Sequence, residues 1–409
     1  MHKILLLVPI FFSLVSKGCS PQSVSTQSNE VEVVAEAEPE LLTGAQRMNM
    51  YLPLLTNKRV AMMVNQTSMI GQTHVVDTLL SIGVNLVRIF APEHGFRGDH
   101  SAGEHVKSTK DEKTGLPIAS LYGSTRKPTK EMLKGIDVII FDIQDVGVRF
   151  YTYISSMHYL MEACAENHIK MMVLDRPNPN GFYVDGPVLD LQYKSFIGMH
   201  PVPLVHGMTV GEFARMINGE RWLSGGDSCA LLVVPCGNYQ HSTKYQLPVR
   251  PSPNLPTMAS VYLYPSLGLF EGTVISVGRG TDHPFEVLGR PGLENGTMEF
   301  TPRSIPGVAD KPKFEGERCS GIQLTEFAKT YLQSYRRVYI DWLYLFYQSR
   351  DTTAGDFFLP VFTKLAGTDQ LQKQIEANVP KAEVYKSWEP GISAFKPIRK
   401  KYLLYPDFE

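Results

Sequence analysis

Apolar runs and segments of helical period alternate along the chain, and this alternation predicts the fold. The apolar runs lie within residues 58–68, 84–95, 135–147 and 169–179, and helical segments lie at 74–83 and 151–168, with a further helix and strand at 208–223 and 229–236. Because the apolar runs are continuous rather than alternating, they are typical of strands that helices cover on both faces. We therefore predict an α/β fold with a doubly wound, mostly parallel sheet.

Polar side chains follow these runs at the points where the predicted strands end. In chain order they are Asn65, Glu93, His94, Tyr122, Asp142, Gln144, Asp145, Asp175 and Arg176. In an open α/β sheet the ligand crevice lies outside the carboxyl ends of the strands, so these residues are predicted to share one crevice. Asp and Asn also cap helices and shape turns, and for Asp175 that structural interpretation stays open beside the functional one.

The segment RIFAPEHGFRGDH changes character within a few positions. It begins as an apolar strand, which Pro92 ends because proline donates no hydrogen bond to a sheet. Gly95 and Gly98 allow the backbone to turn beneath a ligand. Glu93 and His94 are therefore predicted to face the crevice.

Several classes of chemistry lack their sequence signals. No G-x-G-x-x-G or G-x-x-x-x-G-K-[ST] motif follows the first strand, so no nucleotide cofactor is expected, and the G-x-S-x-G motif of serine hydrolases is absent. Conceivable metal ligands exist, but no H-x-H or H-E-x-x-H spacing does, so we expect no catalytic metal; these residues are Glu93, His94, Asp142, Asp145 and His206. With 40 basic and 41 acidic residues, the charge balance does not point to a nucleic-acid partner.

Carboxylates around one crevice suit the hydrolysis of glycosidic bonds. One protonated acid donates to the departing oxygen, while a second group acts as base or nucleophile or stabilises positive charge on the sugar. We predict Glu93 as the acid, since partial burial beside an apolar strand favours the protonated form that a general acid needs. Asp142, Asp145 and Glu271 are the candidates for the second group, and the sequence does not rank them.

A proline-rich segment, RPSPNLPT, has no helical period and is interpreted as a linker between two domains. The predicted domains are residues 44–257 and 258–409, because a body of this length exceeds what one hydrophobic core usually holds. Soon after the linker, Glu271, Arg279 and Asp282 lie among glycines and aromatic residues. A second domain that closes over a crevice commonly supplies ligand contacts. As the alternative, Glu271 and Arg279 form one structural ion pair.

Two aromatic segments near the C-terminus, residues 325–348 and 386–407, have helical character. We interpret both as core helices with a solvated basic face. The chain holds four cysteines after Cys19, too few over this length for a disulfide scaffold, and we expect free, buried thiols.

The first residues carry targeting signals rather than fold. An apolar run after Lys3 is too short for a comfortable membrane span and ends near Cys19, so residues 1–19 are interpreted as an export signal with a lipidated Cys19. Plain secretion is the alternative, since the leucine usually found three residues before a lipidated cysteine is missing. Residues 20–43 suit a flexible tether. The chain is therefore predicted to be an exported lipoprotein of the periplasm or cell envelope.

Several longer motifs carry a family resemblance. In chain order they are APEHGFRGDHSAGEHV, FDIQDVGVRFYTY, LDRPNPNG, GPVLD, PVPLVHGMTVGE, PSPNLPT, LFEGTVISVGRGTD and FKPIRKKYLLYPD. From about Asn57 to the C-terminus, these motifs resemble the NamZ family of exo-β-N-acetylmuramidases, formerly a domain-of-unknown-function family. The resemblance implies a Rossmann-like N-terminal domain, a smaller C-terminal α+β domain and an active site in the cleft between them. It also implies release of N-acetylmuramic acid from the non-reducing ends of peptidoglycan fragments, in cell-wall turnover and recycling.

Matching the family motifs residue by residue identifies a set of site positions. The glutamate of the E-H-G loop is Glu93, the position expected to be catalytic, with Asp142 and Glu271 as further catalytic candidates. The matching positions expected to contact substrate are Arg97, Gln144, Arg149, Tyr151, His206, Asn254 and Arg279, and Asn65, His94, Asp145 and Asp282 complete the predicted set. Val274 and the GRPG segment at 289–292 depart from the family pattern, which puts substrate detail in question more than reaction type.

N-acetylmuramic acid carries a lactyl carboxylate, which an arginine holds through two parallel hydrogen bonds where geometry allows. Arg149 and Arg279 are the first candidates for this contact, and Arg97 is the third. Three alternatives stay open: a non-catalytic wall-glycan-binding lipoprotein, a metal-dependent hydrolase acting on wall fragments, and another glycosidase specificity on the same fold. The enzyme interpretation leads because several carboxylates are expected in one crevice, which plain sugar binding does not need.

Overall fold

The computed structural model describes residues 39–93, 95–97, 109–353 and 355–409, and Glu40–Glu409 form one compact unit. The predicted export signal, Cys19, most of the tether, His94 and Gly98 lie outside the described residues. The predicted tether reaches residue 43, whereas Leu42 already forms a β-bridge with Gly237. No helix within the described ranges is long and apolar enough to cross a membrane.

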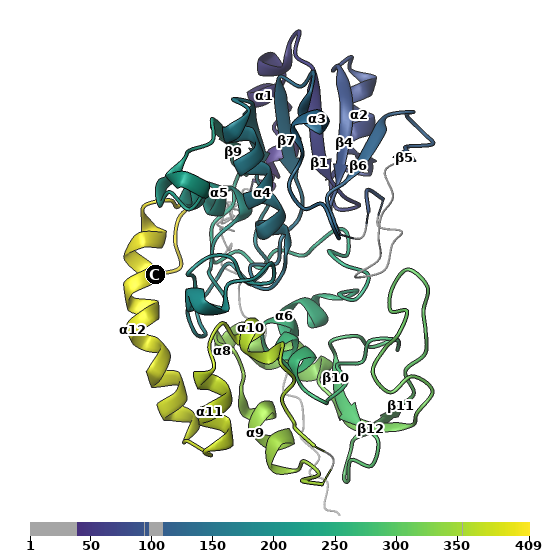
Figure 1. The fold of residues 1–409 in the computed structure, drawn as a ribbon, viewed down its shortest axis with the longest axis vertical. Coiled ribbons are helices and arrows are strands. Elements are labelled where there is room, and N and C mark those ends of the chain that lie inside the picture. The colour runs from purple at the N-terminus through teal and green to yellow at the C-terminus, as the bar shows by residue number, and fades with distance from the viewer. Residues whose placement is uncertain (1–38, 94, 98–108, 354) are drawn as a thin grey trace, which may run out of the picture. The chain divides into compact units, whose positions relative to one another are not determined.

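A seven-stranded sheet forms the N-terminal part of the compact unit, and its strands follow the order of a Rossmann fold (Figure 1). The order is β5-β6-β4-β1-β7-β8-β9, with β5 antiparallel at one edge and the other strands parallel. The strands are β1 (Val60–Val64), β4 (Leu86–Ala91), β5 (Thr109–Lys110), β6 (Pro117–Ser120), β7 (Val138–Asp142), β8 (Lys170–Leu174) and β9 (Leu231–Val234), and a small hairpin pairs β2 (Met69–Ile70) with β3 (Thr73–His74). The predicted doubly wound, mostly parallel sheet is confirmed.

Alternate side chains of the strands enter two separate cores, which explains why the apolar runs are continuous. Met63 of β1 shares a core with residues of α4 and α5, whereas its neighbour Met62 shares a second core with residues of α1 and α2. Successive side chains of a strand point to opposite faces, so helices on both faces require apolar residues at every position. The helices of this part are α1 (Met48–Leu55), α2 (Val75–Ser81), α3 (Lys130–Leu133), α4 (Tyr153–Glu166) and α5 (Val210–Gly219), with short 3-10 helices η1 (Gly44–Gln46), η2 (Leu191–Tyr193) and η3 (Ser224–Gly226).

Side chains fix the point at which α5 begins. Thr209 and Glu212 form a capping box there, satisfying backbone N–H groups that the first turn leaves unpaired. Asp175, which follows β8, accepts hydrogen bonds from Thr209 Oγ1 and Gly211 N, both at 2.7 Å. These contacts support the structural interpretation of Asp175.

The C-terminal part holds a three-stranded antiparallel sheet, ordered β10-β12-β11, among helices. Its first elements are α6 (Met258–Leu267), η4 (Gly268–Gly272), β10 (Val287–Arg290), β11 (Met298–Phe300) and β12 (Cys319–Gln323). The predicted smaller α+β domain is confirmed, and the boundary at residues 257/258 stays a prediction. The later cysteines are buried and free, as predicted; they are Cys164, Cys229, Cys236 and Cys319.

One predicted C-terminal helix is divided into pieces. In place of a continuous helix over 325–348, the chain forms α7 (Thr325–Phe327), the π-helical turn η5 (Ala328–Leu332), α8 (Gln333–Tyr335) and α9 (Asp341–Gln348). Arg336 adopts a left-handed conformation with φ 51° and ends α8. Just beyond it, Val338 N donates to Asp185 Oδ2 of the N-terminal part at 2.6 Å. A tertiary contact thus takes a backbone donor that a continuous helix would use.

The last helices are α10 (Phe362–Ala366), α11 (Gln370–Glu376) and α12 (Lys381–Lys400), and α12 runs from α11 back toward α5 (Figure 1). The predicted helix over 386–407 therefore ends at Lys400. The tail beyond it binds the N-terminal part, since Tyr405 Oη donates to Asp175 Oδ2 at 2.5 Å. Arg399 Nη2 also donates to Gly207 O at 2.7 Å. The chain end therefore ties the two parts together.

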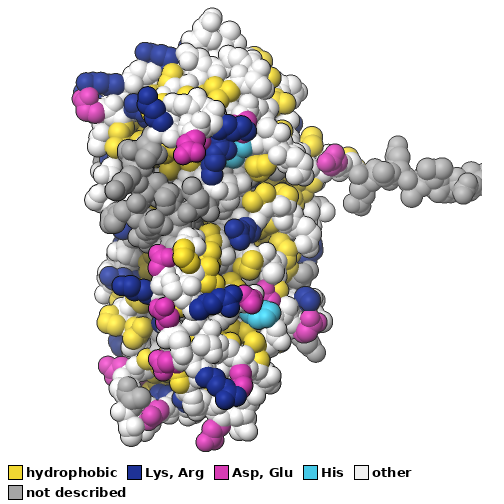
Figure 2. Space-filling view, turned by 90° about the vertical axis from the view of Figure 1, so that its right-hand side faces the viewer, with side chains coloured by type: hydrophobic (Ala, Val, Ile, Leu, Met, Phe, Trp, Pro, Cys, Tyr) yellow, Lys and Arg dark blue, Asp and Glu magenta, His cyan; other side chains and the backbone are white. Residues whose placement is uncertain are grey.

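Charged side chains of both signs are interspersed on the face shown in Figure 2, as the balanced composition predicts.

Candidate active site

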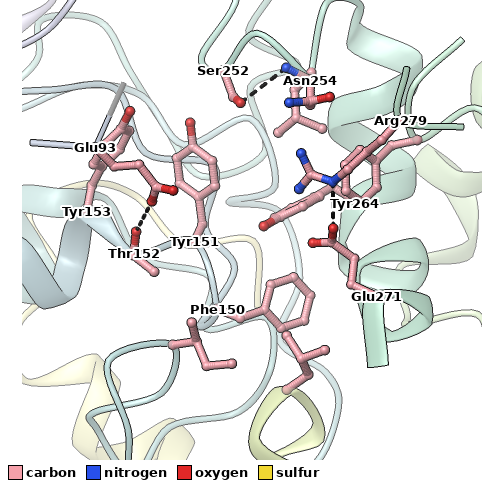
Figure 3. Close-up of a pocket in the computed structure, with 14 residues that line it drawn as sticks. Glu93, Phe150, Tyr151, Thr152, Tyr153, Ser252, Asn254, Tyr264, Glu271 and Arg279 are labelled. Carbon is pink, nitrogen blue, oxygen red and sulfur yellow. Dashed lines mark hydrogen bonds and ion pairs between the residues drawn. The ribbon is translucent and has the colours of Figure 1, made fainter. Parts of the chain in front are cut away.

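A pocket lies where residues of the N-terminal and C-terminal parts meet, with a volume of about 160 Å³. Figure 3 shows Glu93 and Thr152 on one side of it and Glu271 and Arg279 on the other. The lining residues are Glu93, Phe150, Tyr151, Thr152, Tyr153, Ile197, Ser252, Asn254, Leu255, Tyr264, Glu271, Arg279, Phe285 and Leu365. Two of the carboxylates predicted from the sequence therefore meet in one pocket.

Glu93 follows β4 directly and is held by two hydroxyl groups. Tyr122 Oη donates to Glu93 Oε1 at 3.0 Å, and Thr152 Oγ1 donates to Glu93 Oε2 at 3.1 Å. Gly95, with φ 78°, lets the loop turn in the left-handed region that glycine enters without strain. A hydroxyl accepts hydrogen bonds as well as donating them, so both partners can hold Glu93 in either protonation state.

The topology explains why these three residues meet. Glu93 and Tyr122 follow the carboxyl ends of the neighbouring strands β4 and β6, and Thr152 is the residue before α4. The N-terminus of a helix carries positive partial charge from its unpaired N–H groups. A negative charge on Glu93 is therefore stabilised by the first turn of α4 as well as by the two hydroxyls.

Three tyrosines, Tyr151, Tyr153 and Tyr264, also line the pocket. Tyr151 meets Tyr153 and Tyr264 edge to face, with ring centroids 5.0 and 5.8 Å apart, and its hydroxyl donates to Pro251 O at 2.7 Å. The hydroxyl of Tyr153 is buried and has no hydrogen-bond partner among the described residues. Burial and the neighbouring charge of Glu93 raise the pKa of Tyr153. Its hydroxyl therefore stays protonated, buried within the pocket wall that also holds Glu93.

The opposite wall is an ion pair between Glu271 and Arg279. Arg279 Nε donates to Glu271 Oε1 at 2.6 Å, and Glu271 belongs to η4. Burial acts to lower the pKa of Arg279, but the charge and the hydrogen bond of Glu271, together with the charges of Tyr264 and Glu93, raise the pKa overall. The structural ion pair considered from the sequence is present, and it also lines the pocket.

Glycines on both sides of Arg279 shape the turn that carries it. Gly278 and Gly280 both have φ 79°, and a Cβ at Gly280 would lie 2.5 Å from Arg303 O. Only glycine fits such a combination of left-handed backbone and close approach. The GRGTD motif, which resembles a phosphate-binding turn in composition, thus serves to present Arg279.

Asp142 does not share this pocket. It ends β7, is fully buried, and accepts a two-pronged contact from Arg176, with Nε at 2.6 Å and Nη2 at 2.9 Å. Its charge is thus compensated inside the protein. This geometry favours a structural role for Asp142, and its predicted catalytic role stays a prediction.

Asp145 lies behind the pocket tyrosines rather than in the lining. Its Oδ1 accepts from Gly147 N at 2.6 Å, and its Oδ2 has no partner among the described residues. Burial raises the pKa of Asp145 to about 7. The pKa of Tyr151 is raised mainly by burial and further by the charge of Asp145. Asp145 therefore acts electrostatically on the pocket tyrosines, and its predicted contact with substrate stays a prediction.

Arg149, which was predicted to contact substrate, is absent from the described pocket lining. Its guanidinium is buried and donates to Pro187 O at 2.7 Å, Val202 O at 2.8 Å, Leu365 O at 3.1 Å and Ala366 O at 2.6 Å. Burial lowers the pKa of Arg149 to about 9. Because the last two carbonyls belong to α10, Arg149 fastens the C-terminal part to the N-terminal part.

Three more predicted residues are buried with partners of their own. Asn65 Oδ1 accepts from Thr67 N at 2.9 Å, and Gln144 Nε2 donates to Pro177 O at 2.7 Å. Burial lowers the pKa of His206 to about 3, which keeps its ring neutral. The described pocket lining includes none of these three.

The remaining predicted residues divide between the pocket and the surface. Asn254 lines the pocket, where its Oδ1 has no partner within the described chain. Arg97 instead pairs with Asp111 at 2.9 Å, and Asp282 pairs with Arg303 at 2.9 Å on the surface. The prediction for His94 falls outside the described residues. Of the predicted set, the pocket thus brings together Glu93, Tyr151, Asn254, Glu271 and Arg279.

Several pocket residues were not predicted from the sequence. Thr152 and Tyr153 directly follow Tyr151 in the motif FDIQDVGVRFYTY, so their position beside a predicted contact was an available signal. Tyr264 and Leu365 lie in apolar helical segments and carry no such signal. Within the described ranges, no cluster of three or more His, Cys, Asp or Glu side chains is arranged to hold a metal ion.

The fold and the pocket define the class of protein. It is a two-part α/β protein with a Rossmann-type sheet, in which each part contributes a carboxylate to one pocket. Family models narrow this class. Residues 60–259 match the N-terminal model, and residues 262–405 the C-terminal model, of the exo-β-N-acetylmuramidase NamZ. The chain belongs to the NamZ family, as its motifs predict.

Individual relatives agree with this placement. The chain is 39% identical over 424 residues to the peptidoglycan β-N-acetylmuramidase NamZ of Bacillus subtilis (strain 168), with 97% of each chain covered. It is also similar to crystal structures of two DUF1343 family proteins from Bacteroides fragilis NCTC 9343. Their TM-scores are 0.83 and 0.75 at 48% and 31% identity, and each comparison covers 90% of this chain and 100% of the other.

Proposed function

We propose that the protein is an exo-acting β-N-acetylmuramidase, a glycosidase that releases N-acetylmuramic acid from the non-reducing ends of peptidoglycan fragments. The near full-length similarity to a peptidoglycan β-N-acetylmuramidase supports this reaction. The observation that carries the proposal is the pocket in which Glu93 faces the Glu271–Arg279 pair.

Glu93 is the proposed general acid. Its proton passes to the glycosidic oxygen as the bond from that oxygen to the anomeric carbon breaks, and over the whole reaction a water molecule gives its hydroxyl to the anomeric carbon and its proton restores the acid. The carboxylate left behind is stabilised by Tyr122, by Thr152 and by the first turn of α4. Glu271 is the proposed second group, whose negative charge faces the positive charge that develops on the sugar ring.

Arg279 is the proposed partner of the lactyl carboxylate. Of the three arginines considered from the sequence, Arg279 is the one in the described pocket lining. Its Nε bonds to Glu271, and its terminal nitrogens are the donors that a carboxylate would engage in parallel. Phe150 and Leu365 add apolar surface to the same pocket, against which the carbon side of a sugar ring can pack.

The decisive experiment is hydrolysis of a chromogenic β-N-acetylmuramide by the chain without residues 1–38, beside the matching N-acetylglucosaminide. We expect turnover of the muramide, loss of it in Glu93→Gln, and no effect of a chelator. Glu112→Gln is the matched control, because Glu112 is an exposed carboxylate outside the pocket. Sugar binding without turnover would instead favour a wall-glycan-binding protein, and chelator sensitivity a metal-dependent hydrolase.

We also propose that the protein is an exported lipoprotein anchored through Cys19 and resident in the periplasm or cell envelope. The sequence of residues 1–19 supports this proposal. Partition of the full chain into detergent, compared with Cys19→Ala, tests it. Wild-type protein in the aqueous phase would contradict the anchor.

A further inference from the structure

The loop that carries Glu271 turns several carbonyl oxygens toward one point, and Lys313 occupies it. Lys313 Nζ lies 3.3 Å from Phe270 O, 3.2 Å from Glu271 O, 2.5 Å from Thr273 O and 3.3 Å from Ile275 O. An ammonium group has three N–H donors, so the four carbonyls share them. Lys313 therefore cross-links the whole loop at 270–275.

Lys313 belongs to a different segment, between β11 and β12, which also touches the turn that carries Arg279. The neighbouring Pro312 lies so close to Gly280 that a Cβ at Gly280 would be 2.6 Å from Pro312 Cγ. The segment that holds Pro312 and Lys313 thus contacts both the loop that carries Glu271 and the turn that carries Arg279.

Backbone pairing holds the loop at 270–275 from another side. Leu359 N donates to Gly272 O at 2.8 Å, and Val274 N donates to Phe357 O at 3.0 Å. These bonds fix the loop at residues 272 and 274, whereas Lys313 bonds the carbonyls of 270, 271, 273 and 275. The carbonyl of Glu271 itself is therefore held by the ammonium group.

The charge on Lys313 costs the fold some stability. Burial lowers the pKa of Lys313 to about 8, with Glu271 opposing the shift and Arg279 adding to it. A lysine with a lowered pKa is disfavoured in its charged form by its surroundings. A charged group held at such a cost beside a reactive pocket is more typical of a functional support than of core packing.

We propose that Lys313 is a positioning residue for the reaction described above: by holding the carbonyls of the loop, it sets the place of the Glu271 carboxylate and, through it, of Arg279. The inference rests on the proposed function, because it is the proposed reaction that gives Glu271 and Arg279 their contacts with substrate. Lys313 itself is absent from the pocket lining and acts through these two residues.

A double-mutant cycle separates positioning from plain structural support. Lys313→Met keeps most of the side-chain volume and removes the charge. If Lys313 acts through Glu271, we expect Lys313→Met to lower kcat/KM for the muramide about tenfold or more in the wild-type background, because small misplacements of catalytic groups are costly. In the Glu271→Ala background, it should add less than about a twofold loss. Lys311→Met, two residues away and exposed, is the matched control and should change neither value.

Chemical rescue gives a second activity readout. Lys313→Ala leaves a space beside four carbonyl oxygens, and ammonium ions offer the lost N–H donors. We expect ammonium chloride to restore part of the activity of Lys313→Ala, whereas choline chloride at equal ionic strength should not. Equal losses in both backgrounds of the cycle, or no loss at all, would overturn the proposal.

Amide hydrogen exchange makes the test independent of turnover. In Lys313→Met, amides of residues 273–276 should exchange faster, while those of β1 should not, and Lys311→Met should match the wild type. Unchanged exchange in the loop refutes the positioning role even if the enzyme is active. An inactive wild type with loop exchange that depends on Lys313 refutes the proposed function instead.

Discussion

Thr152, the residue that precedes α4, donates its hydroxyl to Glu93 Oε2 at 3.1 Å. The contact places the proposed acid at the positive end of a 14-residue helix. With Tyr122 on the other oxygen, each oxygen of the carboxylate has its own hydroxyl partner. The two hydroxyls can hold either protonation state of Glu93, whereas the helix terminus favours the carboxylate that remains after the proton is given up.

We expect Tyr122→Phe and Thr152→Val each to lower kcat for the muramide by roughly three- to thirtyfold, as expected for loss of one hydrogen bond to a charged group. The melting temperature should change little, because both residues bond a side chain in a partly open pocket. Steady-state kinetics with a melting curve checks this. A loss of stability with unchanged kcat in the surviving enzyme would contradict the assignment.

Arg279→Lys tests recognition of the lactyl group. A lysine keeps the charge but lacks the planar pair of donors, so kcat/KM for the muramide should fall by about tenfold to a hundredfold. Binding of N-acetylglucosamine, measured by calorimetry, should change far less. Arg303→Lys, in an exposed ion pair with Asp282, serves as the control. Similar losses for both sugars would contradict contact with the lactyl carboxylate.

Asp142→Asn distinguishes a structural from a catalytic carboxylate. It leaves the buried guanidinium of Arg176 without its charge partner, so we expect the free energy of unfolding to fall by about 3–5 kcal/mol. Urea denaturation measures this, with the exposed Asp282→Asn as the reference. A stable Asp142→Asn protein that has lost turnover would restore the catalytic interpretation.

Asp145 is expected to make a contribution to stability that declines between about pH 4 and pH 7. Burial raises the pKa of this carboxyl from 3.8 to about 7, so the folded state holds a proton that the unfolded state releases in this range. The resulting stabilisation is complete below about pH 4 and is lost as the pH rises through about 7, a change of a few kcal/mol. Asp145→Asn should flatten the decline. Urea denaturation at pH 4.5, 6 and 7.5 tests this, and parallel curves for the two proteins would refute it.

Local patterns of sequence were sufficient for most of the sheet and for the most informative loop. The runs around Met62, Ile140 and Met172 predict strands because helices on both faces require apolar residues at consecutive positions. Pro92 and Gly95 predict the end of β4 and the turn after it, since each restricts or frees the backbone locally. The position of Glu93 at the carboxyl end of a strand follows from these local features.

The pairing of charges, by contrast, was decided by tertiary structure. Arg149 and Arg279 look equivalent as sequence candidates, yet four carbonyls from distant segments enclose Arg149, while Arg279 faces the pocket. Asp142 and Glu271 differ in the same way, because Arg176 neutralises the first in the core and the second lies at an open wall. The sequence by itself determined most strands of the sheet and the turn after β4, since those depend on neighbours a few residues away, whereas the break in the predicted helix near Arg336 accompanies a tertiary contact to Asp185. Which ionisable side chain is free to meet a substrate depends on partners brought together by the folded chain, such as Arg176 for Asp142, 34 residues away, and Ala366 for Arg149, 217 residues away.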